Sequence, residues 1–263
     1  MKYTRFIAMG DSFTEGMTDE IIDGKYRGWA DRVADELAKH HIDFTYMNTA
    51  VRGKLVGQVK MDQIPMIREH VSGKETLVSF HAGANDVIRP KINPENIYET
   101  YRQAIREVAS TGCTLMIFTV MEKTAGQSKT SQIWQERFHE FNKVIREVGE
   151  EVGAIINEWS IADFMADRRY LAFDRLHLNN EGHSRLAQAV LQKLDYPYDS
   201  QWIIPLPPAK KKNILKRAIN NFAWFTAFAL PWIWRRLRGK SSGDGRKPKY
   251  PAPTKWPKIG RAH

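Results

Sequence analysis

The sequence contains a single cysteine, Cys113, in 263 residues, so no disulfide can form within the chain. It also has no long apolar run near its start. Only four apolar residues, Phe6-Ile7-Ala8-Met9, lie between Arg5 and Gly10, which is too short for the apolar core of a signal peptide. The sequence therefore predicts a cytoplasmic protein.

Two signatures of other enzyme classes are missing. No Gly-x-Ser-x-Gly motif occurs, which argues against the nucleophile turn of the α/β-hydrolase fold. His177, Glu181 and His183 are the best candidates for metal ligands, but their spacing matches no zinc motif. The sequence therefore predicts neither a metal site nor a cofactor.

Acidic residues are nearly absent from the end of the chain. Residues 209–263 contain 15 Lys and Arg against one acid, Asp244, whereas residues 1–208 contain 25 basic and 29 acidic residues. The overall charge of +10 is thus the sum of a slightly acidic body and a strongly basic tail. The basicity therefore belongs to the tail and not to the body, and we do not expect nucleic acid to be the main partner.

Short apolar runs alternate with segments of helical periodicity through the first 200 residues. The runs that predict buried strands cover residues 6–9, 44–47, 77–80, 115–120 and 154–156, and the helical segments cover 27–40, 56–70, 95–110, 131–151 and 180–194. This alternation predicts a parallel sheet with helices on both faces. We expect one domain over residues 1–200, followed by a Pro- and Lys-rich linker over 201–212.

Four short motifs in fixed order carry the groups that ester hydrolysis needs. Ser12 supplies a hydroxyl, Gly53 a backbone N–H, Asn85 a side-chain amide, and His177 an imidazole with Asp174 three residues before it. Ser12, Gly53 and Asn85 each follow a predicted strand, and parallel strands bring their carboxyl ends to one edge of the sheet. Each motif alone is also typical of turns, helix caps or surface pairs, but the four together favour an acyl hydrolase.

With these motifs in order, the chain resembles the SGNH hydrolase superfamily, also called GDSL esterases and lipases. The matching blocks are Gly10–Gly16, Gly53, Gly83–Asp86 and Asp174–Asn179, and the resemblance covers residues 3 to about 195. It implies a three-layer, flavodoxin-like α/β fold with a five-stranded parallel sheet. Phe13 stands where the family name has leucine, and Leu178 where proline often follows the histidine; neither change affects the chemistry.

The resemblance also implies a role for each residue. Ser12 would be the nucleophile, His177 its general base and Asp174 the partner that orients the imidazole. The N–H groups of Ser12 and Gly53 and the side chain of Asn85 would form the oxyanion hole. The sequence thus predicts a serine hydrolase that cleaves small-molecule or lipid carboxylic esters through an acyl-enzyme intermediate. The acyl group, the alcohol, the choice between ester and thioester and the oligomeric state stay open.

The tail admits two interpretations. Residues 213–238 form a basic, aromatic, amphipathic segment in which 17 uncharged residues, Ala218–Trp234, lie between basic clusters. This length is at the lower limit for a membrane span. The segment could lie on an anionic membrane, making the protein peripheral to the inner face, or pack on the esterase domain. Residues 239–263 are expected to be a flexible basic tail. The alternative to an enzyme is a scaffold of the same fold, tethered to membrane or nucleic acid by this tail, with little catalytic role.

Overall fold

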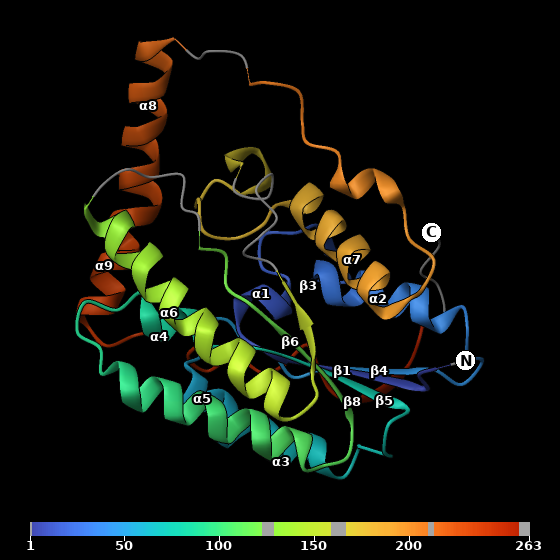
Figure 1. Cartoon of the computed structure of the whole chain (residues 1–263). Coiled ribbons are helices and arrows are strands. Elements are labelled where there is room, and N and C mark those ends of the chain that lie inside the picture. The colour runs from blue at the N-terminus through green and yellow to red at the C-terminus, as the bar shows by residue number, and fades with distance from the viewer. Residues whose placement is uncertain (1, 123–128, 159–166, 210–212, 258–263) are drawn as a thin grey trace.

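A six-stranded sheet runs through the centre of the computed structural model, which describes residues 2–122, 129–158, 167–209 and 213–257 (Figure 1). The strands lie in the order β7-β6-β5-β1-β4-β8. Their bounds are Arg5–Gly10 for β1, Thr45–Asn48 for β4, Thr76–His81 for β5, Thr114–Phe118 for β6, Ile155–Asn157 for β7 and Tyr250–Lys255 for β8. All five strands expected from the sequence are present.

The five strands from β7 to β4 in this order are parallel, and β1 lies between β4 and β5. This is the flavodoxin-like order, in which the chain leaves β1 toward one side of the sheet and later continues on the other side. The predicted three-layer α/β fold is therefore confirmed. The predicted number of strands is corrected from five to six, because β8 pairs antiparallel with the outer edge of β4.

Helices cover both faces of the sheet because successive strand side chains point to opposite faces. Ile7 and Met9 pack on one side, under α3 (Val56–Arg68), α5 (Pro94–Ala109) and α6 (Lys129–Glu151). Phe6 and Ala8 pack on the other, under α2 (Gly28–Ala38) and α7 (Asn180–Leu194). The strand ends are thereby held rigidly between two apolar layers.

Short elements complete the domain around the sheet. They are α1 (Ser12–Glu15), the hairpin of β2 (Ile21–Ile22) and β3 (Lys25–Tyr26), α4 (Ala84–Val87) and the 3₁₀ turns η2 (Arg168–Tyr170) and η3 (Ser200–Ile203). Of these, α1 and α4 directly follow β1 and β5, so they begin at the carboxyl edge of the sheet.

The C-terminal part of the chain first forms a helical segment and then returns to the sheet. Helix α8 (Ile214–Trp224) continues through the π-helical turn η4 (Phe225–Ala229) into α9 (Leu230–Leu237). No helix among the described residues is both long and apolar enough to cross a bilayer.

Strand β8 differs from the flexible basic end that the sequence predicts for this region. The Lys249 ammonium lies 2.6 Å from the buried Asp31 carboxylate. Trp256, 2% exposed, donates from its indole nitrogen to Asp35 at 2.8 Å. Its backbone N–H donates to Phe44 O at 3.0 Å. These contacts make residues 249–256 part of the folded domain.

We expect Trp256→Ala to lower the free energy of unfolding by about 3–5 kcal/mol, because it empties a buried aromatic site and removes the indole donor from Asp35 Oδ1. Urea denaturation measures this change. Trp234→Ala is the matched control, since Trp234 is 56% exposed and its removal should change stability by less than about 1 kcal/mol. Equal effects of the two changes would contradict a structural role for β8.

Candidate active site

Ser12, His177 and Asp174 form a line of hydrogen-bonded side chains. The Ser12 Oγ atom lies 2.9 Å from His177 Nε2, and His177 Nδ1 lies 2.7 Å from Asp174 Oδ2. A carboxylate can only accept, so Nδ1 carries the hydrogen and Nε2 is free to accept from the Ser12 hydroxyl. The structure thus brings together the three residues expected for the triad, in a geometry that can move a proton off the hydroxyl.

A forced turn after β1 places Ser12. Gly10 has a φ of 139°, and a Cβ at this position would lie 2.1 Å from the carbonyl oxygen of His81. The buried side chain of Gln63 holds the turn, accepting from Gly10 N and donating to Gly10 O, each at 2.8 Å. Asp11 then caps α1 by accepting from Phe13 N at 3.1 Å. Only glycine fits at residue 10, so the strand ends there and Ser12 begins the next helix.

The loop before α7 holds the imidazole. Asp174 Oδ1 accepts from the backbone N–H groups of Leu176 and His177, both at 3.0 Å, leaving Oδ2 for the imidazole. Burial raises the pKa of Asp174, but the hydrogen bonds and charge of the His177 side chain and the backbone N–H groups outweigh this, so the net pKa is lowered. The carboxylate therefore stays ionised and fixes the orientation of the ring.

Gly53 and Asn85 lie on the two neighbouring strand ends. Gly53 follows β4 with a φ of 74°, and Asn85 lies in α4 after β5. Asn85 Nδ2 donates to Asp11 Oδ2 at 3.0 Å and to Lys54 O at 3.2 Å. The amide is thus bonded to the residue before Ser12 and to the residue after Gly53, which brings the three expected oxyanion-hole residues to one place.

Asp11 is a site residue that sequence reasoning missed. Its carboxylate is 2% exposed and accepts from the Asn85 amide while its second oxygen caps α1. The Gly-Asp-Ser order was visible in the sequence, but only the fold shows that the carboxylate faces Asn85. Asp11 can therefore set the direction of that amide.

An ion pair fixes the Gly53 loop against α1. Glu15 accepts from the backbone N–H of Arg52 at 2.6 Å and from its guanidinium Nε at 2.9 Å. Both side chains are nearly buried, and the Arg52 guanidinium also lies 5.1 Å from the centre of the Tyr26 ring. Because residue 52 precedes Gly53, this pair sets the position of the Gly53 backbone relative to Ser12.

Asp86, the residue after Asn85, links α4 to the start of α3. Its Oδ2 accepts from Val56 N at 3.0 Å, which caps the start of α3, and burial raises its pKa from 3.8 to about 6. Between these values the folded chain holds a proton that the unfolded chain has released. The contribution of Asp86 to stability therefore falls as the pH rises through this window.

We compare the free energy of unfolding of Asp86→Asn with that of the wild type at about pH 3 and about pH 8. The difference should shift in favour of the variant by about 2–3 kcal/mol as the pH rises, because asparagine keeps an acceptor for Val56 N without ionising. Urea unfolding at the two pH values measures the difference. A difference that does not change with pH would show that Asp86 titrates normally in the folded chain.

The tail contacts the site at two places. The Trp224 indole donates to Asp174 O at 3.0 Å, and the Arg175 guanidinium lies 4.4 Å from the Trp224 ring centre. At the Gly53 loop, a Cβ on Gly53 would lie only 2.1 Å from Ser241 Oγ. The chain after α9 therefore lies against the Gly53 loop before it reaches β8. None of these contacts could be inferred from sequence spacing.

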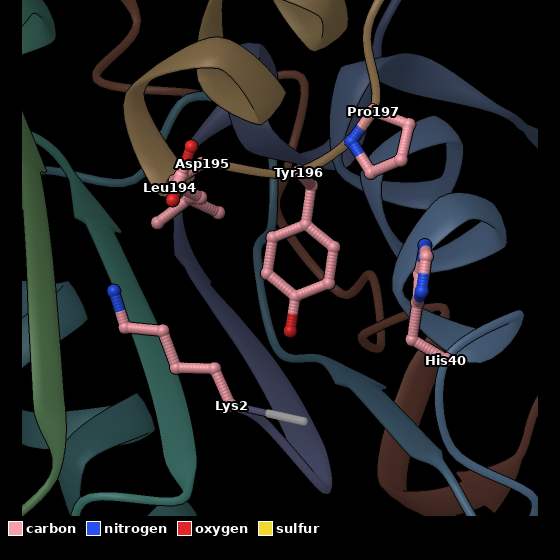
Figure 2. A pocket seen from close by; sticks show the side chains of 6 residues that line it. All are labelled: Lys2, His40, Leu194, Asp195, Tyr196 and Pro197. Atoms are coloured by element: carbon pink, nitrogen blue, oxygen red, sulfur yellow. The ribbon is translucent and has the colours of Figure 1, made fainter.

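A cavity of about 360 Å³ lies elsewhere, lined by Lys2, His40, Leu194, Asp195, Tyr196 and Pro197 (Figure 2). Lys2 precedes the amino end of β1, whereas Ser12 follows its carboxyl end, so this cavity and the triad lie at opposite ends of the sheet. The structure offers no candidate metal site: no group of three metal-ligating side chains occurs within the described ranges. His183 is buried and bonds Met17 O at 3.2 Å, and burial lowers its pKa to about 4.

Comparisons with known proteins identify the family and the fold. The model of the GDSL-like Lipase/Acylhydrolase family matches residues 8–185. A search of curated proteins gave no match. Axe2, an acetylxylan esterase from Geobacillus stearothermophilus, superposes with a TM-score of 0.61 at 18% identity, covering 76% of this chain and 100% of Axe2.

Two further solved structures share the fold. LAE5, an α/β hydrolase enzyme from the metagenome of Lake Arreo in Spain, gives a TM-score of 0.58 at 19% identity, covering 74% of this chain and 97% of LAE5. The psychrotrophic esterase EstA from Pseudoalteromonas sp. gives 0.55 at 13% identity, covering 73% of this chain and 97% of EstA. At these identities the likeness is one of fold.

Proposed function

Because the chain belongs to the GDSL-like lipase/acylhydrolase family, we propose that it hydrolyses carboxylic esters with Ser12 as nucleophile and an acyl-enzyme intermediate. The observation that carries the proposal is the continuous contact from Ser12 Oγ through His177 to Asp174. A hydroxyl is a weak nucleophile on its own, and an adjacent imidazole that can accept its proton makes it competent.

The proposed reaction has two halves. Ser12 Oγ attacks the ester carbonyl carbon while His177 Nε2 takes the hydroxyl proton, which gives a tetrahedral oxyanion. The carbon–oxygen bond to the alcohol then breaks, and the leaving alkoxide takes the proton from Nε2. Water repeats these steps on the acyl-enzyme, releasing the carboxylic acid and restoring the Ser12 hydroxyl. Asp174 stabilises the imidazolium in both halves.

The oxyanion would be held by the N–H groups of Ser12 and Gly53 and by Asn85 Nδ2. The Asn85 amide carries two hydrogens. Its bond to Asp11 is the shorter one and holds the amide in place, so the substrate oxygen would share or replace the longer bond to Lys54 O. Asp11 thus acts in this proposal as a positioning residue for Asn85.

We expect Asn85→Ala to lower kcat by about 10²–10³-fold, the usual effect of removing one oxyanion-hole donor. Steady-state kinetics with a soluble p-nitrophenyl ester measure it. Asn96→Ala, at an exposed position of α5, should leave kcat unchanged. A change in KM alone would make Asn85 a substrate-binding residue instead.

Turnover of p-nitrophenyl acetate and longer acyl esters by the purified chain tests the proposal itself. A serine-directed phosphonate should label the wild-type protein at Ser12 and leave Ser12→Ala unlabelled. If the chain neither turns over any ester of the series nor reacts with the phosphonate, it is not a serine hydrolase, and a scaffold role for this fold would be favoured.

A further inference from the structure

The helical segment 214–237, which we call the tail helix, exposes an unusual amount of apolar surface. None of the residues of α8 is buried, and Figure 1 shows α8 projecting at the edge of the molecule. Nine of the eighteen exposed large apolar side chains among the described residues lie on it: Ile214, Leu215, Ile219, Phe222, Phe225, Leu230, Ile233, Trp234 and Leu237. Leu215, Ile219 and Phe222 are spaced four and three residues apart, so they share one face of α8. An exposed apolar surface of this kind marks an interaction site.

The charges of the tail helix indicate what covers this surface. Between residues 213 and 240 the sequence contains no acid, and its basic residues are Lys216, Arg217, Arg235, Arg236, Arg238 and Lys240. A second copy of the chain would bring another basic helix and be repelled. An anionic lipid surface offers phosphates to the basic side chains and an apolar interior to Phe222 and Trp234.

The tail helix is hydrogen-bonded to the loop before α7, which carries Asp174 and His177. Besides the bond from Trp224 to Asp174 O, the Arg175 guanidinium donates to Asn221 Oδ1 at 2.8 Å. Two neighbouring side chains of that loop, Phe173 and Leu176, are 59% and 42% exposed. A lipid surface that covers the tail helix therefore also lies beside the residues that flank Asp174.

We propose that the tail helix docks the protein on anionic lipid bilayers and thereby holds the loop that carries Asp174 and His177 beside the lipid surface, where esters of lipids are presented to Ser12. The choice of substrate rests on the proposed esterase function. The docking does not, because the tail helix contains none of the proposed catalytic residues.

Vesicle co-sedimentation of the full-length Ser12→Ala protein tests the docking without interference from hydrolysis. We expect binding to vesicles of phosphatidylglycerol and phosphatidylcholine, and at least about 10-fold weaker binding to vesicles of phosphatidylcholine alone. Raising the salt concentration should weaken the binding because exposed charges are screened.

Matched variants separate the tail helix from the rest of the surface. Phe222→Ser and Trp234→Ser should each weaken vesicle binding by about 10-fold, since each removes a large inserted side chain. Ile42→Ser should have no effect, although Ile42 is 87% exposed, because it lies on the body. Lys216→Glu should weaken binding by about 5-fold or more, and Lys193→Glu on α7 should not.

Three results would overturn the docking proposal. The first is no binding of the intact protein to anionic vesicles. The second is equal vesicle binding of the tail-helix variants and their controls. The third is concentration-dependent dimerisation in sedimentation velocity, lost in Phe222→Ser, without any vesicle binding; this would make a second copy the partner. Turnover of soluble esters without vesicle binding would contradict the docking proposal and leave the proposed function standing. Vesicle binding without turnover of any ester would contradict the proposed function and leave the docking proposal standing.

Discussion

Ser12→Ala is expected to lower kcat for ester hydrolysis by about 10⁶-fold, because no other group at the site can form the acyl-enzyme. The change removes a single oxygen whose hydrogen-bond partner in the structure is His177. The backbone of Ser12 keeps its helix position through the carbonyl bonds to Gly16 and Met17, so the melting temperature should stay within a few degrees of the wild-type value.

Pre-steady-state release of p-nitrophenol measures the loss most directly, because the wild type should show a burst that the variant lacks. His177→Ala should be about as severe, and the double variant should be no slower than either single variant, since the two residues act as a unit. A Ser12→Ala enzyme within about 10-fold of wild-type kcat would contradict the assignment of the nucleophile.

Asp174→Asn is expected to lower kcat by about 10⁴-fold through the tautomer of His177. Asp174 Oδ1 accepts two backbone N–H groups, so the oxygen of an asparagine would take that position and its NH₂ group would face His177 Nδ1. Nδ1 would then have to accept, and the hydrogen would move to Nε2. In that state the imidazole donates toward Ser12 Oγ and cannot accept its proton.

Steady-state kinetics on a soluble ester would show this loss, with Asp167→Asn as the control. Asp167 is an acid outside the candidate triad that caps the turn at Arg169, and its replacement should leave kcat unchanged. We expect Asp174→Asn to be less severe than His177→Ala because the base itself remains. Equal losses in the two variants would mean that the imidazole has no function without the carboxylate.

The sequence by itself determined the layers of the fold and the edge at which the candidate site lies. The apolar runs that precede Ser12, Gly53 and Asn85 alternate with helical segments and so predict strands of one parallel sheet, and parallel strands end at a common edge. The Asp174–His177 spacing is short enough for a contact within one turn, and the structure has that contact at 2.7 Å. These features are local or follow from apolar runs and helical repeats, so no tertiary information was needed.

The environment of these residues was decided by the tertiary structure. The sequence shows Asp11 beside Ser12, but its bond to Asn85 joins residues 74 positions apart. Likewise, the basic aromatic pattern of the tail predicts an amphipathic helix but does not identify the surface that its apolar face contacts, since many apolar surfaces could cover that face. Only the fold places Trp224 on Asp174 O and Ser241 against Gly53.

Strand β8 shows most clearly the difference between what the local sequence predicts and what the tertiary structure decides. Its sequence, Tyr250-Pro-Ala-Pro-Thr-Lys255, contains two prolines, which in isolation argue against a strand. Thr254 pairs with Tyr46 and Tyr250 with Asn48, so the register of the two strands shifts between these pairs, and Pro251 and Pro253 lie in the irregular stretch. Proline is tolerated at such irregularities and on edge strands, because it does not have to donate a hydrogen bond there. Whether such a segment is a strand depends on the free edge of β4 beside it, which the local sequence does not contain.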